Sequence, residues 1–387
     1  MATSSHFKTR IFSLLLALYL LSSMPKPVGG EDSIRYKYED YQEDDDRIRV
    51  RAHYISADKD LSPSTRLGVV GLIDTITGTT PTGELPEAGA DRVPMGDLVD
   101  ERRSIILNLD HQLKDHAFTF ELNYSNESDY LSEGGALTYR RYLNKKNTTI
   151  ELGYSSLQDE LSAPTLPEKE RKDSEDVLIG ITQILDPATV WSADLTYGRE
   201  DGYLADPYKV VEKDIELISD FFLAITFPEN RPRSRQKWIF YTDILRDFEK
   251  LKGSLQTSYR YFSDDADLDA HTFSLQWFQK ISDQIILEPL MRYYKQSAAN
   301  YYHHDLNLTG ILPDRNTIGH APYFSSDHRL SKMETYTWGA KLVYFFSQDL
   351  EFNFKIQRYE MTGLDPLTHP SVYSDADILT VGGRWFF

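Results

Sequence analysis

The sequence predicts an all-β protein: a transmembrane, antiparallel, up-and-down β-barrel of about 16 strands, with long extracellular loops and short periplasmic turns. Three observations predict it. Segments of roughly ten residues alternate in polarity along most of the chain, as strands do when one side meets lipid and the other meets water. The connections between these segments are alternately short and long. The last segment, residues 377–387, alternates and ends in Trp385, Phe386 and Phe387.

The first 30 residues follow the order of a secretory signal peptide. Lys8 and Arg10 precede an apolar run over residues 11–21, and a turn-prone stretch ends at Gly30. The run is too short to span a bilayer as a helix. We therefore expect export and cleavage near residue 30, with a single barrel domain over residues 31–387 in the outer membrane of a Gram-negative bacterium.

The composition fits a barrel and argues against other classes of protein. The chain carries a formal charge of -18 and contains 25 Tyr, 19 Phe and 5 Trp, yet its mean hydropathy is -0.47. A barrel combines these properties because only alternate residues are apolar and aromatic residues gather at the membrane interfaces. The excess of acids argues against nucleic acid as a partner. The absence of cysteine excludes disulfides, thiolate metal sites and a lipoprotein anchor.

The first predicted hairpin, residues 33–42 and 47–57 around the acidic turn 43–46, illustrates the two faces. The expected apolar face contains Ile34, Tyr36, Tyr38, Ile48, Val50, Ala52 and Tyr54. The opposite face contains Arg35, Lys37, Glu39, Arg47, Arg49, Arg51 and His53. So many charges on one side need water, which predicts a hydrated lumen.

The other strands are expected by the same alternation. Their ranges are 65–77, 102–112, 116–125, 134–143, 147–157, 176–185, 189–199, 236–246, 252–262, 269–280, 284–295, 333–346, 350–361 and the terminal segment. Pro289 cannot donate a ladder hydrogen bond, so we expect a bulge there. The long loops 78–101, 158–174, 200–235 and 297–332 all fall outside the cell. The loop 200–235 contains the apolar run 215–225, which is expected to form a loop helix, an extra hairpin or a segment folded into the lumen.

Charged residues on the water-facing side are the candidate pore lining. They are Arg47, Arg49, Arg51, Glu121, Arg292, Glu351 and Lys355. One interpretation is a transverse field that selects solutes by charge. The alternative is a set of mutually neutralising charges that hold the shape of the barrel.

Catalysis and dedicated metal binding find little support, so we expect no enzyme. Asp110 and His111, like Asp115 and His116, are adjacent, and adjacent residues of a strand point to opposite faces. Asp327 and His328 lie in a predicted loop, so a catalytic role for this pair is left open. The weak metal candidates are His303, His304 and His328. We expect no cofactor beyond Ca²⁺ or Mg²⁺ bound by the acidic tracts 43–46 and 264–269.

Seven stretches spread over the chain resemble the outer-membrane family catalogued as domain of unknown function 3570. They are YQEDDDRIRV, DTITGTTPTG, YSNESDYLS, GYLADPYKVV, RPRSRQ, YKQSAANYY and SSDHRLS, starting at residues 41, 74, 124, 202, 231, 294 and 325. The residues that carry the resemblance include Tyr41, Arg47, Asp74, Gly78, Pro81, Asp129, Tyr130, Asp206, Pro207, Tyr208, Arg231, Pro232, Asp327 and Arg329. The resemblance implies a barrel, and it implies an association with flavin-transfer and thioredoxin-like envelope proteins.

Two functions are therefore expected. The first is a porin-like channel or transport component for small solutes. The second is a non-conducting barrel that serves a periplasmic redox system. The expected partners are outer-membrane lipid, lipopolysaccharide and the barrel assembly machinery, which would read the insertion signal at Trp385 and Phe387.

Overall fold

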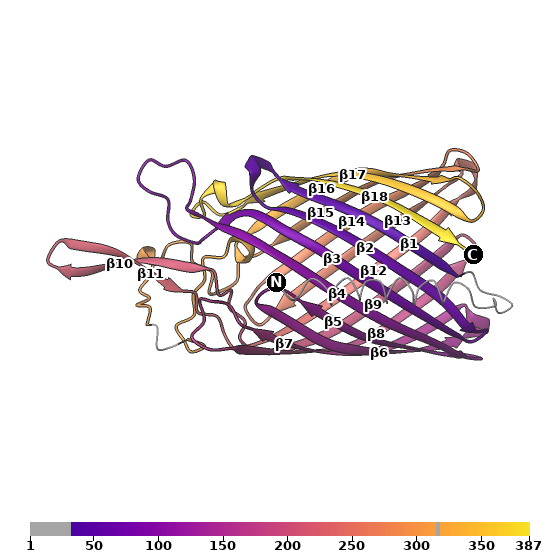
Figure 1. Cartoon of the computed structure of the whole chain (residues 1–387), viewed down its shortest axis with the longest axis horizontal. Helices are drawn as coiled ribbons and strands as arrows, with labels where there is room; N and C mark the ends of the chain where they lie inside the picture. Colours follow the sequence, from indigo (N-terminus) through magenta and orange to yellow (C-terminus); the bar gives the residue numbers. More distant parts are fainter. Residues whose placement is uncertain (1–31, 315–317) are drawn as a thin grey trace, which may run out of the picture.

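Sixteen antiparallel strands close into a barrel in a computed structural model, which describes residues 32–314 and 318–387 (Figure 1). The strands are β1 (Ser33–Glu43), β2 (Arg49–Ser62), β3 (Thr65–Pro81), β4 (Met95–Leu113), β5 (His116–Asn126), β6 (Tyr130–Leu143), β7 (Thr148–Leu161), β8 (Glu170–Asp186), β9 (Thr189–Gly202), β12 (Ser234–Phe248), β13 (Gly253–Asp264), β14 (Asp269–Lys280), β15 (Ile285–Gln296), β16 (Met333–Phe345), β17 (Leu350–Gly363) and β18 (Ala376–Phe386). The predicted barrel is confirmed, and the predicted signal peptide lies outside the described residues.

Short 3₁₀ turns complete the described structure. They are η1 (Asp44–Asp46), η2 (Asn144–Lys146), η3 (Glu249–Leu251), η4 (Leu306–Leu308), η5 (His328–Leu330) and η6 (Pro370–Val372). Within residues 32–314 and 318–387, no helix is long and apolar enough to cross a membrane.

The terminal strand closes the barrel by pairing with the first one. Ile34 lies opposite Trp385 and Tyr38 lies opposite Val381. Residues that face each other across a ladder share one side of the sheet, so Trp385 and Val381 lie on the outer wall with Ile34. The rings of Trp385 and Phe387 are 4.9 Å apart at the end of this strand. Trp385 is exposed and Phe387 is half-buried, and their role as an insertion signal stays a prediction.

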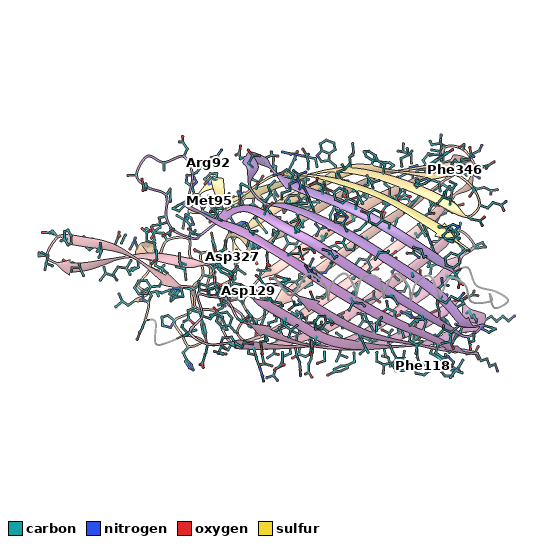
Figure 2. The ribbon with its side chains drawn as sticks, in the orientation of Figure 1. Arg92, Met95, Phe118, Asp129, Asp327 and Phe346 are labelled. Atoms are coloured by element: carbon teal, nitrogen blue, oxygen red, sulfur yellow. The ribbon has the colours of Figure 1, made fainter. Side chains whose placement is uncertain are left out.

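The outer wall is identified by its exposed apolar side chains. On β5, Phe120, Leu122 and Tyr124 are exposed, while Glu121 and Asn123 between them are half-buried. Pairing carries these two faces from β4 to β6. On β2 the expected faces are exchanged, because Ala52 and Tyr54 pair with Glu39 and Lys37 on the lumen side. One end of the barrel carries the short turns, near Phe118 and Phe346, and the other carries the long loops, near Asp129 and Asp327 (Figure 2). We call these the turn end and the loop end.

Several strands extend further toward the loop end than alternation predicts. β4 begins at Met95 and β8 begins at Glu170, several residues before the alternating segments. Backbone pairing needs no apolar side chain, so a ladder continues above the membrane where the side chains become polar on both faces. The loops after β3 and β7 are correspondingly shorter than expected.

The apolar run in the third long loop forms an extra hairpin, which is one of the three alternatives left open. β10 (Val210–Ile218) pairs with β11 (Phe221–Pro228) and projects away from the loop end (Figure 1). The expected bulge at Pro289 was wrong: β15 keeps one register with both neighbours. Pro289 faces outward opposite Ala340, and the β14 ladder skips it without shifting.

The long loops pack on one another and form a folded cap over the loop end. We define the cap as residues 82–94, 203–209, 229–233, 297–314, 318–332 and 364–375. One apolar cluster joins Leu268, Tyr301 and Leu330, and a second joins Val211, Leu306 and Phe324. Because their side chains are buried, the cap is an ordered body, and the functional residues of the loops are held in fixed places.

Candidate functional site

Four of the predicted lumen residues face the interior of the barrel. Glu121 pairs with Ala136, Arg292 with Thr337, and Glu351 with Arg384, all on the side opposite the exposed apolar residues. Lys355 lies on the same inner side, opposite Thr380. Their effect on ion selectivity remains a prediction.

Arg49 and Arg51 lie on the outer wall, which corrects the predicted lumen set. Arg51 pairs with Asp40, on the side of Tyr36 and Tyr38, and Arg49 forms an ion pair of 2.6 Å with Asp40. These residues lie near the loop end, where the outer wall has left the apolar belt and charged side chains are tolerated outside. The polarity rule therefore assigns them to the wrong face.

Arg47 does not line the lumen either. It precedes β2, and its side chain points into the cap. Its guanidinium donates to the carbonyl oxygens of Ser371, at 3.0 Å, and Val372, at 3.2 Å. Its Nε lies 3.3 Å from a carboxylate oxygen of Glu43. Arg47 therefore anchors the loop between β17 and β18 to the rim of the barrel.

Most of the lumen charges that lack an ion-pair partner fall into two separate sectors. Among the described residues, no salt bridge within 4.0 Å involves the acids Glu121, Asp194 and Asp243, which lie on β5, β9 and β12. The same holds for the bases Arg260, Arg292 and Lys355 on β13, β15 and β17. Apart from Glu351 on β17, which has no salt bridge among the described residues and lies in the sector of the bases, acids remain unneutralised on one part of the wall and bases on the other. This is the arrangement of a transverse field.

Five charged residues from three cap segments form the centre of the cap, and we call them the latch cluster. Arg231 lies 2.8 Å from Glu229 and 2.8 Å from Asp327. Arg329 binds Asp327 at 2.6 Å and Asp206 at 2.8 Å. The members from the resemblance motifs at 202, 231 and 325, which are far apart in sequence, are thus brought together by charge.

Because the latch cluster is buried, separating its charges requires a large free energy. The side chains of Glu229 and Asp327 are 1% and 2% exposed, and that of Arg231 is 14% exposed. Ser325 donates a hydrogen bond to Glu229, as does the backbone N–H of Asp206. Removing one partner of such a buried network leaves an uncompensated charge.

Burial also shifts the titration of these groups. It raises the pKa of Glu229 to about 7, against the opposing attraction of Arg231. It lowers the pKa of His328 to about 4. Burial alone would raise the pKa of Asp327, but the charges and hydrogen bonds of Arg329 and Arg231 outweigh it and hold that pKa well below its usual range.

The two shifted groups predict opposite pH dependences for the stability of the cap. The pKa of Glu229 is raised in the folded cap, so its contribution is present below pH 4.5 and is lost as the pH rises through about 7. The pKa of His328 is lowered from 6.5 to about 4, so its contribution is present above pH 6.5 and is lost as the pH falls toward 4. The two contributions largely offset each other between these values.

Glu229→Gln should therefore leave the His328 dependence visible, and the cap should become more stable as the pH rises from 4.5 to 6.5. His328→Gln should leave the opposite slope. Each effect is on the order of 3 kcal/mol, from about 1.4 kcal/mol per pKa unit. Protection of cap amides from hydrogen exchange, corrected for the intrinsic rate at each pH, measures both. Slopes of the same sign in the two variants would contradict this assignment.

Residues 203–209 form a strap across the mouth of the barrel. Asp206 binds Arg329, the hydroxyl of Tyr208 donates to Asp129, and Lys209 donates to the carbonyl oxygen of Pro81. Gly83 allows the first residue of β10, directly after the strap, to lie this close, because Gly83 has a φ of +104° and a Cβ there would collide with the carbonyl oxygen of Val210. The resemblance motifs at 74, 124 and 202 thus meet at the strap.

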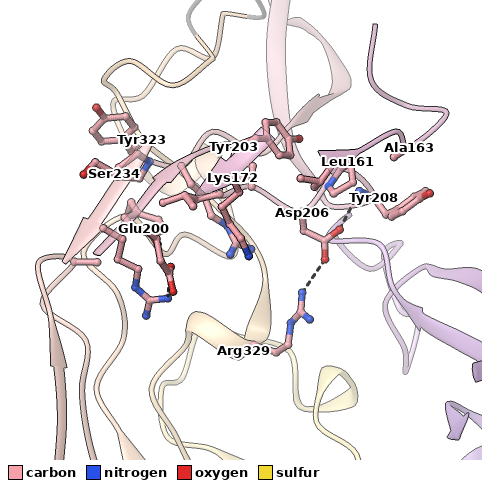
Figure 3. Close-up of a pocket in the computed structure, with 18 of the residues that line it drawn as sticks. Leu161, Ala163, Lys172, Glu200, Tyr203, Asp206, Tyr208, Ser234, Tyr323 and Arg329 are labelled. Carbon is pink, nitrogen blue, oxygen red and sulfur yellow. Dashed lines mark hydrogen bonds and ion pairs between the residues drawn. The ribbon is translucent and has the colours of Figure 1, made fainter. Parts of the chain in front are cut away.

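A cavity of about 850 Å³ opens beside the strap, and a second of about 600 Å³ lies on the other side of it. Asp206, Tyr208 and Arg329 line both cavities. Figure 3 shows the first cavity, with Asp206 and Arg329 joined across it and Tyr208 beside them. The ion pair of Asp206 and Arg329 therefore divides one space from the other.

The candidate catalytic pairs do not form sites in the described residues. Asp110 faces the lumen and accepts a hydrogen bond of 2.6 Å from Thr119, whereas His111 lies outside and contacts Thr65. Asp115 lies in a turn, and His116 contacts Tyr139. Asp327 and His328 belong to the cap. The Nδ1 of His328 lies 4.0 Å from a carboxylate oxygen of Asp327, and both Asp327 carboxylate oxygens accept hydrogen bonds from arginine.

Residues 32–314 and 318–387 contain no group of three or more His, Asp or Glu side chains arranged to hold a metal. His303, His304 and His328 are therefore not brought together as ligands. The acidic tracts form ion pairs within the chain: Asp44 binds Arg358 at 2.6 Å, and Asp264 binds Arg235 at 2.5 Å. Loop-bound Ca²⁺ or Mg²⁺ stays a prediction.

Sequence reasoning missed Glu229 as part of the cap centre, and it did not single out Lys209 and Ser325, which lie within the resemblance motifs at 202 and 325. Glu229 lies outside the motifs that carry the resemblance, in a stretch whose polarity is that of any loop. One signal was present, because Glu229 directly follows the apolar run that forms β11 and lies two residues before Arg231. An acid held next to a base at the end of an apolar segment favours a buried ion pair.

Comparisons with known proteins find one family model and several solved structures that are similar to this chain. The family model described as "Protein of unknown function (DUF3570)" matches residues 17–167 and 162–379. No curated protein matches the chain. Among solved structures, the siderophore receptor PirA of Pseudomonas aeruginosa is similar with a TM-score of 0.45 and 9% identity over 93% of this chain, which spans 62% of that receptor. The in-vitro folded outer membrane protein OmpT of Vibrio cholerae has a TM-score of 0.44 and 10% identity, with coverage of 92% and 96%.

Proposed function

This chain belongs to the DUF3570 family, and we propose that it is an outer-membrane channel or transport component for small solutes whose entrance is restricted by the cap. Export by a cleaved signal peptide to the outer membrane of a Gram-negative bacterium is part of the proposal. The chain needs no catalytic role and no cofactor for this function.

One observation carries the proposal: the two sectors of unneutralised charge on the lumen wall. A barrel that served only as a scaffold would be expected to neutralise its interior charges in pairs, as Lys341 and Glu288 do at 3.3 Å. Glu121, Asp194 and Asp243 face a lumen that also contains Arg260, Arg292 and Lys355. Such fields act on a solute only in a water-filled passage.

The cap itself favours a second candidate, a non-conducting barrel that serves as an outer-membrane scaffold or partner of a periplasmic redox system. The latch cluster and the strap cover the loop end, and their contacts are largely buried. A permanently closed cap would leave the barrel without a transport role.

Uptake of uncharged sugars of graded size into liposomes distinguishes the two. The folded protein, checked by its heat-modifiable gel mobility, should admit the smallest sugars and exclude larger ones, because the cap narrows but does not seal the passage. Folded protein that admits no sugar would remove the channel and favour the non-conducting barrel.

A further inference from the structure

We propose that the 850 Å³ cap cavity binds small organic ammonium cations. This inference rests on the proposed function and deepens it by naming the class of solute that meets the entrance first. The argument uses the charge balance of the cavity, its aromatic wall and a contact that the chain already makes with its own ammonium group.

The basic side chains of the cavity wall are already neutralised. Lys172 lies 2.9 Å from Asp159, and Arg235 lies 2.5 Å from Asp264. Arg231 and Arg329 belong to the latch cluster, where each binds two carboxylates. None of these cations is left to attract an anionic solute, so an anion entering the cavity would have to displace a carboxylate.

Three acids of the cavity wall are not neutralised in this way. Glu127, Asp129 and Asp265 line the cavity, and in the part of the chain that the structure describes none of them lies within 4.0 Å of a basic group. Asp129 accepts a hydrogen bond from the hydroxyl of Tyr208, and Asp265 accepts one from the backbone of Gln236 at 3.1 Å. Hydrogen bonds hold these carboxylates in place but leave their charge unneutralised.

Burial raises the pKa of Glu127, and the nearby acids Asp100, Asp74 and Asp129 act in the same direction, against the attraction of Arg102. A half-buried carboxylate among like charges is stabilised by a cation. The unpaired acids that line this side of the cavity therefore favour a solute that brings a positive charge.

The wall is also rich in tyrosine, which accepts cations over its ring. The tyrosines that line the cavity are Tyr130, Tyr203, Tyr208, Tyr301 and Tyr323. The chain already makes one contact of this kind: the Nζ of Lys172 lies 5.8 Å from the centroid of the Tyr130 ring. An ammonium group from solution would use the same combination of carboxylate and aromatic ring that Lys172 uses. Several such rings around one cavity fit an alkylated ammonium better than a bare metal ion.

Choline and its uncharged isostere 3,3-dimethylbutan-1-ol test the site directly. Calorimetric titration of the full, refolded protein in detergent micelles should show binding of choline and none of the isostere at the same concentrations. Since the two molecules have nearly the same shape, this comparison isolates the charge and needs no variant. Equal binding of both molecules, or of neither, would overturn the proposal.

The double variant Glu127→Gln with Asp129→Asn should weaken choline binding roughly tenfold or more, since it removes two negative charges that attract the ammonium group. Asp283→Asn is the matched control, because this acid is 94% exposed at the turn end. Gel mobility confirms that each variant folds. Unchanged binding in the folded double variant would refute the site.

The binding result is independent of the uptake result. Choline binding without sugar uptake would support the binding site and contradict the channel. Sugar uptake without choline binding would support the channel and contradict the binding site.

Discussion

Replacing Arg231 by alanine should release the cap while leaving the barrel folded. The change leaves Glu229 and Asp327 buried next to each other without the cation that lies 2.8 Å from both. Breaking a buried charge pair costs about 3–5 kcal/mol, which is enough to open a small body of packed loops. The loops should become accessible to protease, and hydrogen exchange of their amides should accelerate by orders of magnitude, with the strand amides unchanged.

Arg199→Ala is the matched control for this experiment. Arg199 pairs with Asp201 at 2.6 Å on the same end of the barrel, but the two side chains are 56% and 44% exposed. An exposed pair contributes at most about 1 kcal/mol, so this variant should keep its cap closed. If both variants behave alike, the latch cluster does not hold the cap.

Replacing Arg260, Arg292 and Lys355 together by glutamine should make the lumen strongly cation-selective. These bases lack ion-pair partners among the described residues, whereas Glu121, Asp194 and Asp243 would remain on the other sector. Removing one side of a transverse field leaves a net negative wall, which should shift the permeability ratio of K⁺ to Cl⁻ by roughly tenfold. The reversal potential across a salt gradient measures this shift.

Replacing Arg49 and Arg51 by glutamine supplies the control. Both residues lie on the outer wall near the loop end, so their charges are outside the conducting path. Selectivity should stay at its native value. A shift as large as that of the lumen variant would mean that the two arginines act on the passage after all.

Much of the barrel was predictable because lipid and water impose a strict alternation on every strand. The faces of β5 and β9 follow it: Phe120 and Leu122 are exposed, and Trp191 pairs on the outer side with Ile244. The rule fails where the membrane ends. Arg49 and Arg51 face outward because a strand that continues past the apolar belt needs no apolar side chain there.

The cap could be predicted only in part. The resemblance motifs supplied Asp206, Arg231, Asp327 and Arg329 as residues worth attention, but neither their spacing nor their polarity states that they meet. Contacts between loops depend on long-range packing, which local periodicity does not encode. Glu229 shows the limit, since its role comes from burial against segments about one hundred residues away in sequence.

Single-channel conductance of the native protein and of Arg231→Ala, recorded in the same planar bilayer, is the most decisive measurement. A capped channel predicts a small, steady native conductance and a several-fold larger one in the variant, because releasing the latch cluster widens the entrance without changing the barrel. Folded native protein and folded variant that are both silent would contradict the channel. Equal conductances would show that the cap does not restrict the passage.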